Sequence, residues 1–389
     1  MRPQSSRLGH KKSRNGCIRC KQRHVKQAAE QTSKTSSNSV DSPSTPGSNN
    51  TNKEQPPQLG SLIVAQGDSA ESETCQSPAT WLQSLRLLHH YDTTVCAILA
   101  HEQPTDEVWR ITVPQAAFSH AFLMNGLLAL SALHYAQCHP DQRREYILIS
   151  SHFQSLALQS FSTRLQHISE ENFEPYFLLA TFVFILSMCS IADHQDQGVP
   201  PPPSDIAQSF LLLQGVQSIC DFKPMETWSR DGPLGPLLAD DSLPLMKPTG
   251  AFQMRMDLVY SLARDLSPSF EAINVRSSCI LALESLRTIH AACTDPASGL
   301  RARRIWMWPI SLTHVFIDLI TQKHHVALIL LAHYAALAKP FEHPHWMNNG
   351  WSSNVMASVE HALEEQWHEW IAWPKKSVVE GINVDEMEP

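Results

Sequence analysis

The sequence has little glycine and none of the short motifs that hydrolytic or nucleotide-binding sites use. Glycine accounts for 14 of 389 residues, which is about half of its usual share of roughly 7%. No G-x-G-x-x-G, G-x-x-x-x-G-K-[ST], G-x-S-x-G or H-E-x-x-H pattern occurs. We therefore expect a protein that is not an enzyme. A helical enzyme of unknown type remains a third interpretation, and no motif supports it.

Aromatic residues are absent from the first 80 positions. All 14 Phe, 10 Trp and 6 Tyr lie between Trp81 and Trp373. A segment without aromatic side chains lacks its largest buriable surfaces, and residues 31–80 are mostly Ser, Thr, Asn, Gln, Pro and Gly. Such a composition buries too little to offset the entropy of ordering the chain. The sequence therefore predicts an N-terminal arm at 1–30, a disordered linker at 31–80 and a folded domain from Trp81.

Charge divides the chain at the same place. Residues 1–30 hold nine Lys or Arg and one acid, Glu30, whereas the whole chain has a net charge of -8. An acidic body is repelled by nucleic acid, so any contact with a polyanion is expected from the arm alone.

The chain also lacks the features of secreted and membrane proteins. Nine cysteines are an odd number, scattered mostly through apolar segments, which indicates reduced core thiols rather than a disulfide framework. No apolar stretch follows the basic N-terminus. The longest apolar run, 177–192, contains Thr181, Ser187 and Ser190 and is shorter than the roughly 20 residues of a membrane span. We expect a soluble, intracellular protein without a membrane span.

From Trp81 onward the apolar spacing is helical, and no segment alternates as a strand would. The sequence predicts an all-α fold, a large helical bundle over 81–375 followed by a tail at 376–389. The run from Tyr176 to Ala192 has no polar face and should be surrounded by other helices. A stripe of Val355, Val359, Leu363 and Trp367 should pack on the core. The expected helices lie around Leu88 to Leu99 and at about 114–139, 141–168, 175–192, 207–222, 251–265, 268–293, 311–337 and 353–372, with a loop at 224–250.

One motif in the arm carries chemistry. The arm reads HKKSRNGCIRCKQRHVK and resembles the fungal zinc binuclear cluster regulators. In that family six cysteines, in two C-x2-C-x6-C halves, hold two zinc ions, and a helix presents Lys and Arg to the DNA major groove. By this resemblance Cys17 and Cys20 are metal ligands, and the expected DNA-binding residues are Lys11, Lys12, Arg14, Arg19, Lys21, Arg23 and Lys26.

The sequence departs from that pattern after the first pair of cysteines. Gln27 stands where the third cysteine belongs, and the next cysteine is Cys75. Structural zinc is nearly always four-coordinate, and two ligands cannot hold two ions. A truncated exon, a splice variant and a genuine loss are all compatible with the sequence. Without zinc, the basic residues could bind phosphates non-specifically, act as a nuclear import signal or form a solvated tail.

A second resemblance covers residues 81 to about 375. The blocks LRLLHHYDTTVC, VWRITVPQAAFSHAFLMNGLLALSALHYA, MWPISLTHVFIDLITQKHHVALILLAHYAALA and HEWIAWP are similar to the regulatory domain of the sterol uptake control proteins. The resemblance implies a dimer-forming helical domain with an apolar pocket for a sterol or small lipid. It also implies a nuclear protein that is cytoplasmic when ligand-bound. Phe122, Met124, Phe316 and Leu330 are candidates for the pocket wall, and each is also a typical core residue.

Paired histidines invite a metal site, but their spacing argues against one. His89 with His90, His324 with His325, and His343 with His345 do not share a helix face as an i, i+4 pair would.

Together these features predict a sequence-specific nuclear regulator of RNA polymerase II transcription, whose helical domain senses a sterol or small lipid and which controls a biosynthetic gene cluster. The rival interpretation is a helical ligand-binding or dimerising protein that has lost its zinc cluster and does not bind DNA. The two interpretations share a fold and differ only in the arm.

Overall fold

The computed structural model describes residues 78–100, 103–162, 168–194, 198–221, 234, 249–266, 270–294, 304–342 and 346–388. Thr74–Pro389 form one compact unit, and every regular element described within it is a helix. This confirms the predicted all-α class. The predicted arm and all but the last three residues of the linker lie outside the described residues.

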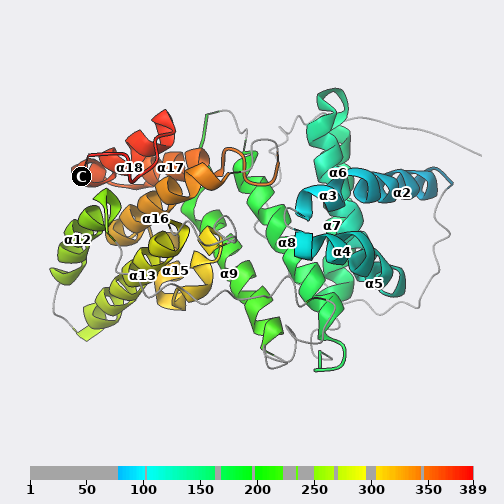
Figure 1. The fold of residues 1–389 in the computed structure, drawn as a ribbon, viewed down its shortest axis with the longest axis horizontal. Helices are drawn as coiled ribbons and strands as arrows, with labels where there is room; N and C mark the ends of the chain where they lie inside the picture. The colour runs from blue at the N-terminus through cyan, green and yellow to red at the C-terminus, as the bar shows by residue number, and fades with distance from the viewer. Residues whose placement is uncertain are drawn as a thin grey trace, which may run out of the picture. The chain divides into compact units, whose positions relative to one another are not determined.

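The first group of helices in the chain begins at Pro78 and ends at Ala192 (Figure 1). Its members are α2 (Pro78–His90), the π-helical turn η1 (Tyr91–Val95), α3 (Cys96–Leu99), α4 (Gln103–Glu107), the π-helical turn η2 (Val108–Thr112), α5 (Val113–Ser119), α6 (Ala121–Cys138), the 3-10 turn η3 (Pro140–Gln142), α7 (Arg143–Ser162) and α8 (Phe173–Ala192). In this group α6 packs against α2, α5, α7 and α8.

The second group of helices follows from Pro203. Its members are α9 (Pro203–Cys220), α12 (Ala251–Arg264), α13 (Phe270–Thr294), the 3-10 turn η5 (Trp308–Ser311), α15 (His314–Thr321), α16 (His325–Ala338), the 3-10 turn η6 (Lys339–Phe341), α17 (Trp351–Ala362), the 3-10 turn η7 (Glu365–Trp367) and α18 (His368–Glu380). The predicted loop at 224–250 lies outside the described residues except at Leu234 and its last two positions.

Buried side chains form two hydrophobic clusters. The N-terminal core is built mainly from α2 to α8 and includes Leu87, Tyr91, Leu127, Phe182 and Trp346. The C-terminal core is built mainly from α9 to α18 and includes Phe210, Phe252, Trp308, Phe316, Leu330 and Trp351. Because burial of apolar surface is the main driving force of folding, these two clusters account for most of the packing of the domain.

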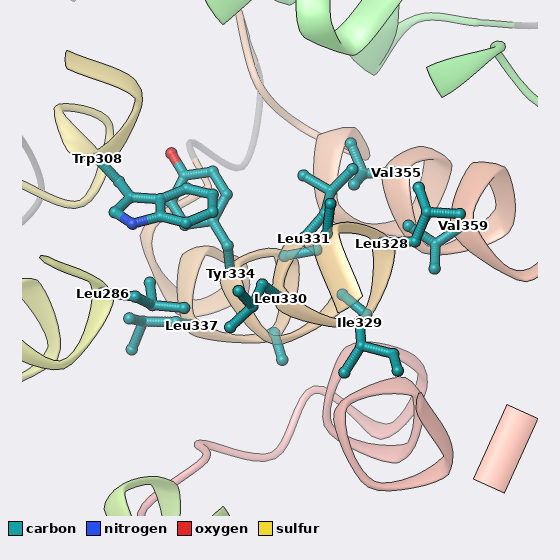
Figure 2. Close-up of a cluster of buried hydrophobic side chains, with 14 of the residues drawn as sticks. Leu286, Trp308, Leu328, Ile329, Leu330, Leu331, Tyr334, Leu337, Val355 and Val359 are labelled. Atoms are coloured by element: carbon teal, nitrogen blue, oxygen red, sulfur yellow. The ribbon is translucent and has the colours of Figure 1, made fainter. Parts of the chain in front are cut away.

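Helix α16 is the centre of the C-terminal core. Every one of its residues from Val326 to Ala338 is buried, so it has no solvent face. Figure 2 shows its side chains pointing outward in several directions, toward Leu286, Trp308 and Val355 on the surrounding elements. A helix that is apolar all round needs neighbours on every side, and α12, α13, α15, α17 and α18 provide them.

Helix α8 joins the two cores. Most of its buried residues belong to the N-terminal core, whereas Met188 and Ile191 belong to the C-terminal core. It contacts α6 on one side and α9 and α17 on the other, which confirms that this apolar segment is surrounded by helices.

The sequence-based argument that this segment is too short for a membrane span was wrong. α8 has 20 residues with a mean hydropathy of 2.0, which is long and apolar enough to cross a membrane by those criteria. Its burial argues for a core helix instead, since 61% of its most apolar window is buried inside the protein. Among the described residues the only other candidate is the pair α15 and α16, which is bent by 97°.

Three predicted single helices are each divided in two. The stretch 114–139 is interrupted between α5 and α6, where His120 is extended (φ -132°, ψ 102°). The stretch 311–337 bends between α15 and α16 at Lys323, which has a left-handed φ of 60°. The stretch 353–372 is interrupted where Leu363 is extended (φ -85°, ψ 138°). Val355, Val359 and Leu363 of the predicted stripe are buried in the C-terminal core, and Trp367 packs against it from η7.

The residues after 375 continue the fold. The predicted boundary falls inside α18, which ends at Glu380 before Gly381 with φ 66°, as expected of a left-handed C-cap. Beyond it Val384 is buried, and Trp373 Nε1 donates to the carbonyl of Glu388 (2.9 Å). The segment predicted as a tail is therefore packed on the C-terminal core.

Candidate functional site

The predicted metal and DNA-binding residues lie outside the described residues. These are Cys17 and Cys20, together with Lys11, Lys12, Arg14, Arg19, Lys21, Arg23 and Lys26. The donor set does not fit a binuclear zinc cluster, because two cysteines stand where that site needs six. In the described part of the chain no group of three or more His, Cys, Asp or Glu side chains could hold a metal ion.

The four candidate pocket residues divide between the two cores. Phe122 is 2% exposed in the N-terminal core and stacks on Tyr176, with ring centroids 5.1 Å apart. Met124 packs against the same core. Phe316 and Leu330 are fully buried in the C-terminal core. The structure does not bring the four together, so they do not form the wall of one pocket, and each pair remains a separate candidate lining.

His90 and His134 form a pair that sequence spacing did not reveal. His90 Nε2 and His134 Nδ1 lie 2.8 Å apart, joining α2 to α6, and Cys138 Sγ lies 3.7 Å from His134 Nε2. Desolvation, followed by the charges of His90 and His139, lowers the pKa of His134 to about 4. Desolvation also lowers the pKa of His90, as do the neighbouring His139 and His89. Both rings are therefore neutral at pH 7, and one donates a hydrogen bond to the other.

The other histidine pairs from the sequence contribute aromatic packing or lie outside the described residues. His324 stacks on His325, and His325 stacks on Trp367 at an interplanar angle of 11°. Desolvation is the main cause that lowers the pKa of both rings, to about 4 for His324. His343 and His345 are not among the described residues.

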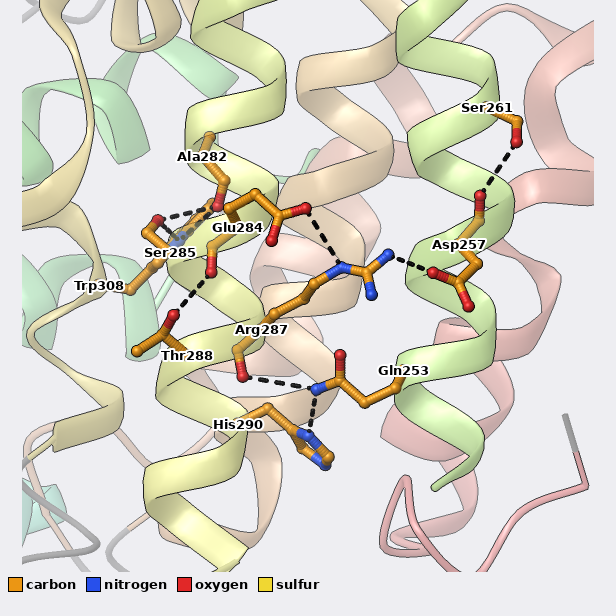
Figure 3. Close-up of polar contacts among 10 residues, drawn as sticks. All are labelled: Gln253, Asp257, Ser261, Ala282, Glu284, Ser285, Arg287, Thr288, His290 and Trp308. Atoms are coloured by element: carbon orange, nitrogen blue, oxygen red, sulfur yellow. Dashed lines mark hydrogen bonds and ion pairs between the residues drawn. The ribbon is translucent and has the colours of Figure 1, made fainter. Parts of the chain in front are cut away.

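A set of polar contacts joins α12 to α13 (Figure 3). Arg287 pairs with Asp257 (2.6 Å) and with Glu284 (3.6 Å), and Gln253 Nε2 donates to His290 Nδ1 (2.8 Å). Ser285 Oγ donates to the carbonyl of Ala282 (2.9 Å) while accepting from the Trp308 indole (3.0 Å). These contacts hold the helices together. Because the Ser285 hydroxyl is bonded to a carbonyl and to an indole rather than to a general base, it is not an activated nucleophile.

Two hollows lie near the junction of α6, α7 and α8. The first, of about 390 Å³, is an open surface depression lined by Pro140, Arg143, Arg144, Ile147 and Leu148. The second, of about 200 Å³, is less open and mostly polar, and is lined among others by Gln137, Arg143, Asp193, Trp346 and Asn349. No sequence pattern pointed to the second hollow, because its residues come from four separate segments.

Comparison with known proteins supplies the functional context. Residues 86–209 match the Fungal specific transcription factor domain, a region that includes α6, α7, α8 and the start of α9. The relatives that match this chain are fungal transcription factors. A Zn(2)-C6 fungal-type transcription factor of Gibberella zeae is 24% identical over 325 residues, which cover 77% of this chain and 63% of the relative.

Two shorter matches agree with that assignment. The Zn(2)-C6 fungal-type transcription factor afumD of Aspergillus fumigatus is 28% identical over 35% of this chain and 36% of its own length. Sterol uptake control protein 2 of Saccharomyces cerevisiae is 34% identical over 30% of this chain and 12% of its own length. The chain thus spans less than two thirds of each of these relatives.

These similarities confirm the coarse functional prediction. The chain is related to transcription regulators rather than to enzymes. The names of these two relatives describe them as Zn(2)-C6 fungal-type transcription factors.

Proposed function

We propose that the chain is a nuclear regulator of RNA polymerase II transcription, whose helical domain senses a sterol or small lipid and whose target genes belong to a biosynthetic cluster. The match of residues 86–209 to the Fungal specific transcription factor domain carries this proposal. The similarity to one Zn(2)-C6 factor over 77% of the chain supports it across both cores.

The sterol part of the proposal rests on a narrower basis. One relative is named for sterol uptake control, and it shares 34% identity over 118 residues. Phe316 and Leu330 are buried among apolar side chains of the C-terminal core, and side chains of this kind line sterol sites. In this proposal the ligand-bound chain stays in the cytoplasm, and the domain forms a homodimer.

A DNA-binding assay on the full chain tests the regulatory role. Promoter fragments of a neighbouring gene cluster are titrated at about 0.15 M salt, where non-specific phosphate contacts are weakened, with zinc present. Saturable binding that an unrelated fragment fails to compete supports the proposal. The triple variant Lys21→Gln, Arg23→Gln and Lys26→Gln should abolish that binding, whereas Lys376→Gln, an exposed basic residue on α18, should not change it.

A binding assay with ergosterol tests the sterol part separately. Titration of the full chain should show saturable binding of about one sterol per chain. Linear, non-saturable uptake would instead indicate partition onto exposed apolar surface and would rule out a sterol site.

A specific observation favours a second function. Gln27 and the missing second half of the cysteine pattern remove the metal frame that orders a DNA-reading helix in the resembled family. The chain would then be a non-DNA-binding protein that pairs with a relative through its helical domain. Co-purification with a six-cysteine relative, together with no protected site in a DNA footprint, would support this function over the first.

A further inference from the structure

The outer side of α2 exposes a group of apolar side chains. Trp81 is 55% exposed, Leu82 61% and Leu85 42%. Because residues three and four positions apart lie on the same side of a helix, these three form one surface. Together with His89 and Asp92, which continue the same side and are also exposed, they make up the outer face of α2. The solvent side of a surface helix is normally polar, so this face has the composition of a contact surface.

The inner side of the same helix is already packed. Leu87 and Tyr91 are fully buried in the N-terminal core, and the carbonyl of Leu87 accepts a hydrogen bond from Ser131 Oγ on α6 (2.6 Å). Tyr91 Oη donates to the carbonyl of Trp109 (2.9 Å). α2 packs mainly against α6 and lies at the edge of the first group of helices (Figure 1). These contacts fix the rotation of the helix about its axis, so it does not turn to bury the outer face.

The charges around the outer face narrow the kind of partner. α2 contains no acidic residue, and its one arginine, Arg86, donates to the hydroxyl of Tyr146 on α7 (3.2 Å). A basic segment such as the N-terminal arm therefore finds no carboxylate within this helix. Two copies of the chain, each with a net charge of -8, repel one another, but at about 0.15 M salt this repulsion is screened beyond roughly 8 Å. Contact through helices without acidic side chains keeps the remaining repulsion small.

The outer face matches itself when one copy is reversed. In an antiparallel pair centred on Leu85, the two leucines meet, and Trp81 of one copy lies beside His89 of the other. Asp92 then faces the first turn of the other α2, which has no acidic residue of its own. A negative charge is favourable there, because the free N–H groups give a helix N-terminus a partial positive charge. A surface that complements itself in this way is typical of a two-fold dimer.

The size of the outer face predicts a contact of moderate affinity. The exposed parts of its three apolar side chains amount to about 300 Å² of apolar surface, which is as large as the largest patch of many monomers. Two copies that pair from Trp81 to Asp92 bury about 1,000 Å² in total, near the lower limit for a specific interface. An interface of this size is typical of a reversible dimer with a micromolar Kd rather than of an obligate one.

We propose that two copies of this chain associate through their outer faces, with the two α2 helices antiparallel about a two-fold axis at Leu85. This inference rests on the homodimer of the proposed function and names the surface that forms it. The two Pro78 residues, at which α2 begins, lie about 20 Å apart in such a pair. Two arms that are joined through these points bind neighbouring half-sites on DNA with higher avidity than one arm does, so the contact couples self-association to DNA binding.

Sedimentation equilibrium of the full chain, without DNA or lipid, measures the self-association. A monomer and dimer equilibrium with a Kd of about 1–100 μM is expected at about 0.15 M salt. Leu85→Asp places two carboxylates together on the two-fold axis and should weaken the dimer at least about 100-fold. Phe118→Asp, at another apolar side chain that is 69% exposed and lies on α5, is the matched control and should leave the Kd unchanged.

Cross-linking tests the antiparallel register independently of Leu85→Asp. The background variant keeps the four buried cysteines and replaces the other five by serine, namely Cys17, Cys20, Cys75, Cys138 and Cys220. On this background Leu85→Cys should form an interchain disulfide when oxidised glutathione is added, because this position meets its copy on the axis. A mixture of Trp81→Cys chains and His89→Cys chains should form a disulfide between the two. Trp81→Cys chains alone should not, since their two cysteines lie about 12 Å apart along the helices.

Two results would overturn this interface and leave the homodimer of the proposed function in place on another surface. They are a Kd that does not change in Leu85→Asp, and cross-linking of Trp81→Cys chains with themselves in preference to His89→Cys chains. A chain that stays monomeric at all concentrations would overturn the interface and the homodimer together, as expected if another protein or the preceding linker covers the outer face. DNA and sterol binding are measured on the same chain, so a failure of the regulatory function is recorded separately.

Discussion

Nε2 of His290 and Oδ1 of Asp385 lie 2.9 Å apart, and this contact joins the C-terminal part of α13 to the end of the chain. His290 is 1% exposed, and its other nitrogen accepts from Gln253 Nε2 at 2.8 Å. With Nδ1 accepting, Nε2 carries the proton and donates to the carboxylate. The segment after α18 is therefore fixed to α12 and α13 by a buried polar chain.

Removal of the carboxylate should loosen this segment and lower stability. Asp385→Ala leaves the buried His290 donor unpaired, which should reduce the free energy of unfolding by about 1–3 kcal/mol. Urea denaturation of the full chain measures the change, and limited proteolysis should show faster cleavage after Glu380. Asp265→Ala is the control, because Asp265 is 71% exposed in its pair with Arg264 and should change stability by less than about 0.5 kcal/mol. Equal stability of the two variants would mean that the contact between Asp385 and His290 contributes nothing to the free energy of unfolding.

A glycine lies at a tight contact between α6 and α8. A Cβ atom at Gly126 would lie 2.5 Å from Leu179 Cδ1 and 3.2 Å from Phe182 Cδ2, and both side chains are fully buried. Gly126→Ala should therefore destabilise the fold by about 1–3 kcal/mol, although alanine is the better helix former. Thermal unfolding checks this expectation. The double variant Gly126→Ala with Leu179→Ala should show a coupling energy, because the second change removes the clash.

Gly215 in α9 should behave in the opposite way. A Cβ atom there has nothing within 4 Å, and the residue lies inside the helix. Gly215→Ala should raise the free energy of unfolding by about 0.5–1 kcal/mol through helix propensity and loss of entropy in the unfolded chain. A loss of stability at this position would show that α9 does not hold its helical form there.

The element that the sequence predicted best is the one with the strongest composition signal. α8 is almost entirely apolar, and a helix without a polar face must be central, so its burial followed from the sequence alone. The bends at Lys323 and Leu363 did not, because neither position carries the glycine or proline that usually marks a break. Tertiary packing around α16 fixes these bends.

The candidate sites were harder to predict because they depend on contacts between distant segments. Phe122 and Phe316 were grouped by residue type, but burial in two separate cores keeps them apart. The polar hollow brings together residues as distant as Gln137 and Asn349, and no local pattern indicates such a meeting. His90 and His134 are likewise 44 residues apart in the chain.

Buried neutral histidines should make the fold sensitive to acid. His333 is 1% exposed on α16, and desolvation, opposed by the hydrogen bond to the Ile329 carbonyl and assisted by the charge of Arg255, lowers its pKa to about 4. The unfolded chain binds a proton at about pH 6.5 while the folded chain does not. The contribution of the neutral His333 to the free energy of unfolding is therefore fully present above pH 6.5. It is lost as the pH falls toward 4, by up to about 3 kcal/mol. Urea denaturation at intervals from pH 7 to pH 4.5 measures the slope.

Replacement of this imidazole should flatten the pH dependence. His333→Phe keeps an aromatic ring beside Phe252 and Trp373 and removes the group that titrates, so the loss of stability below pH 6.5 should be smaller than in the unmodified chain. A residual slope should remain, because the pKa values of His134 and His324 are also lowered to about 4. His152→Gln, at an exposed position of α7, controls for loss of a surface imidazole. An unchanged slope in His333→Phe would show that His333 is solvated in the folded protein, and α16 would then not be the dry centre of its core.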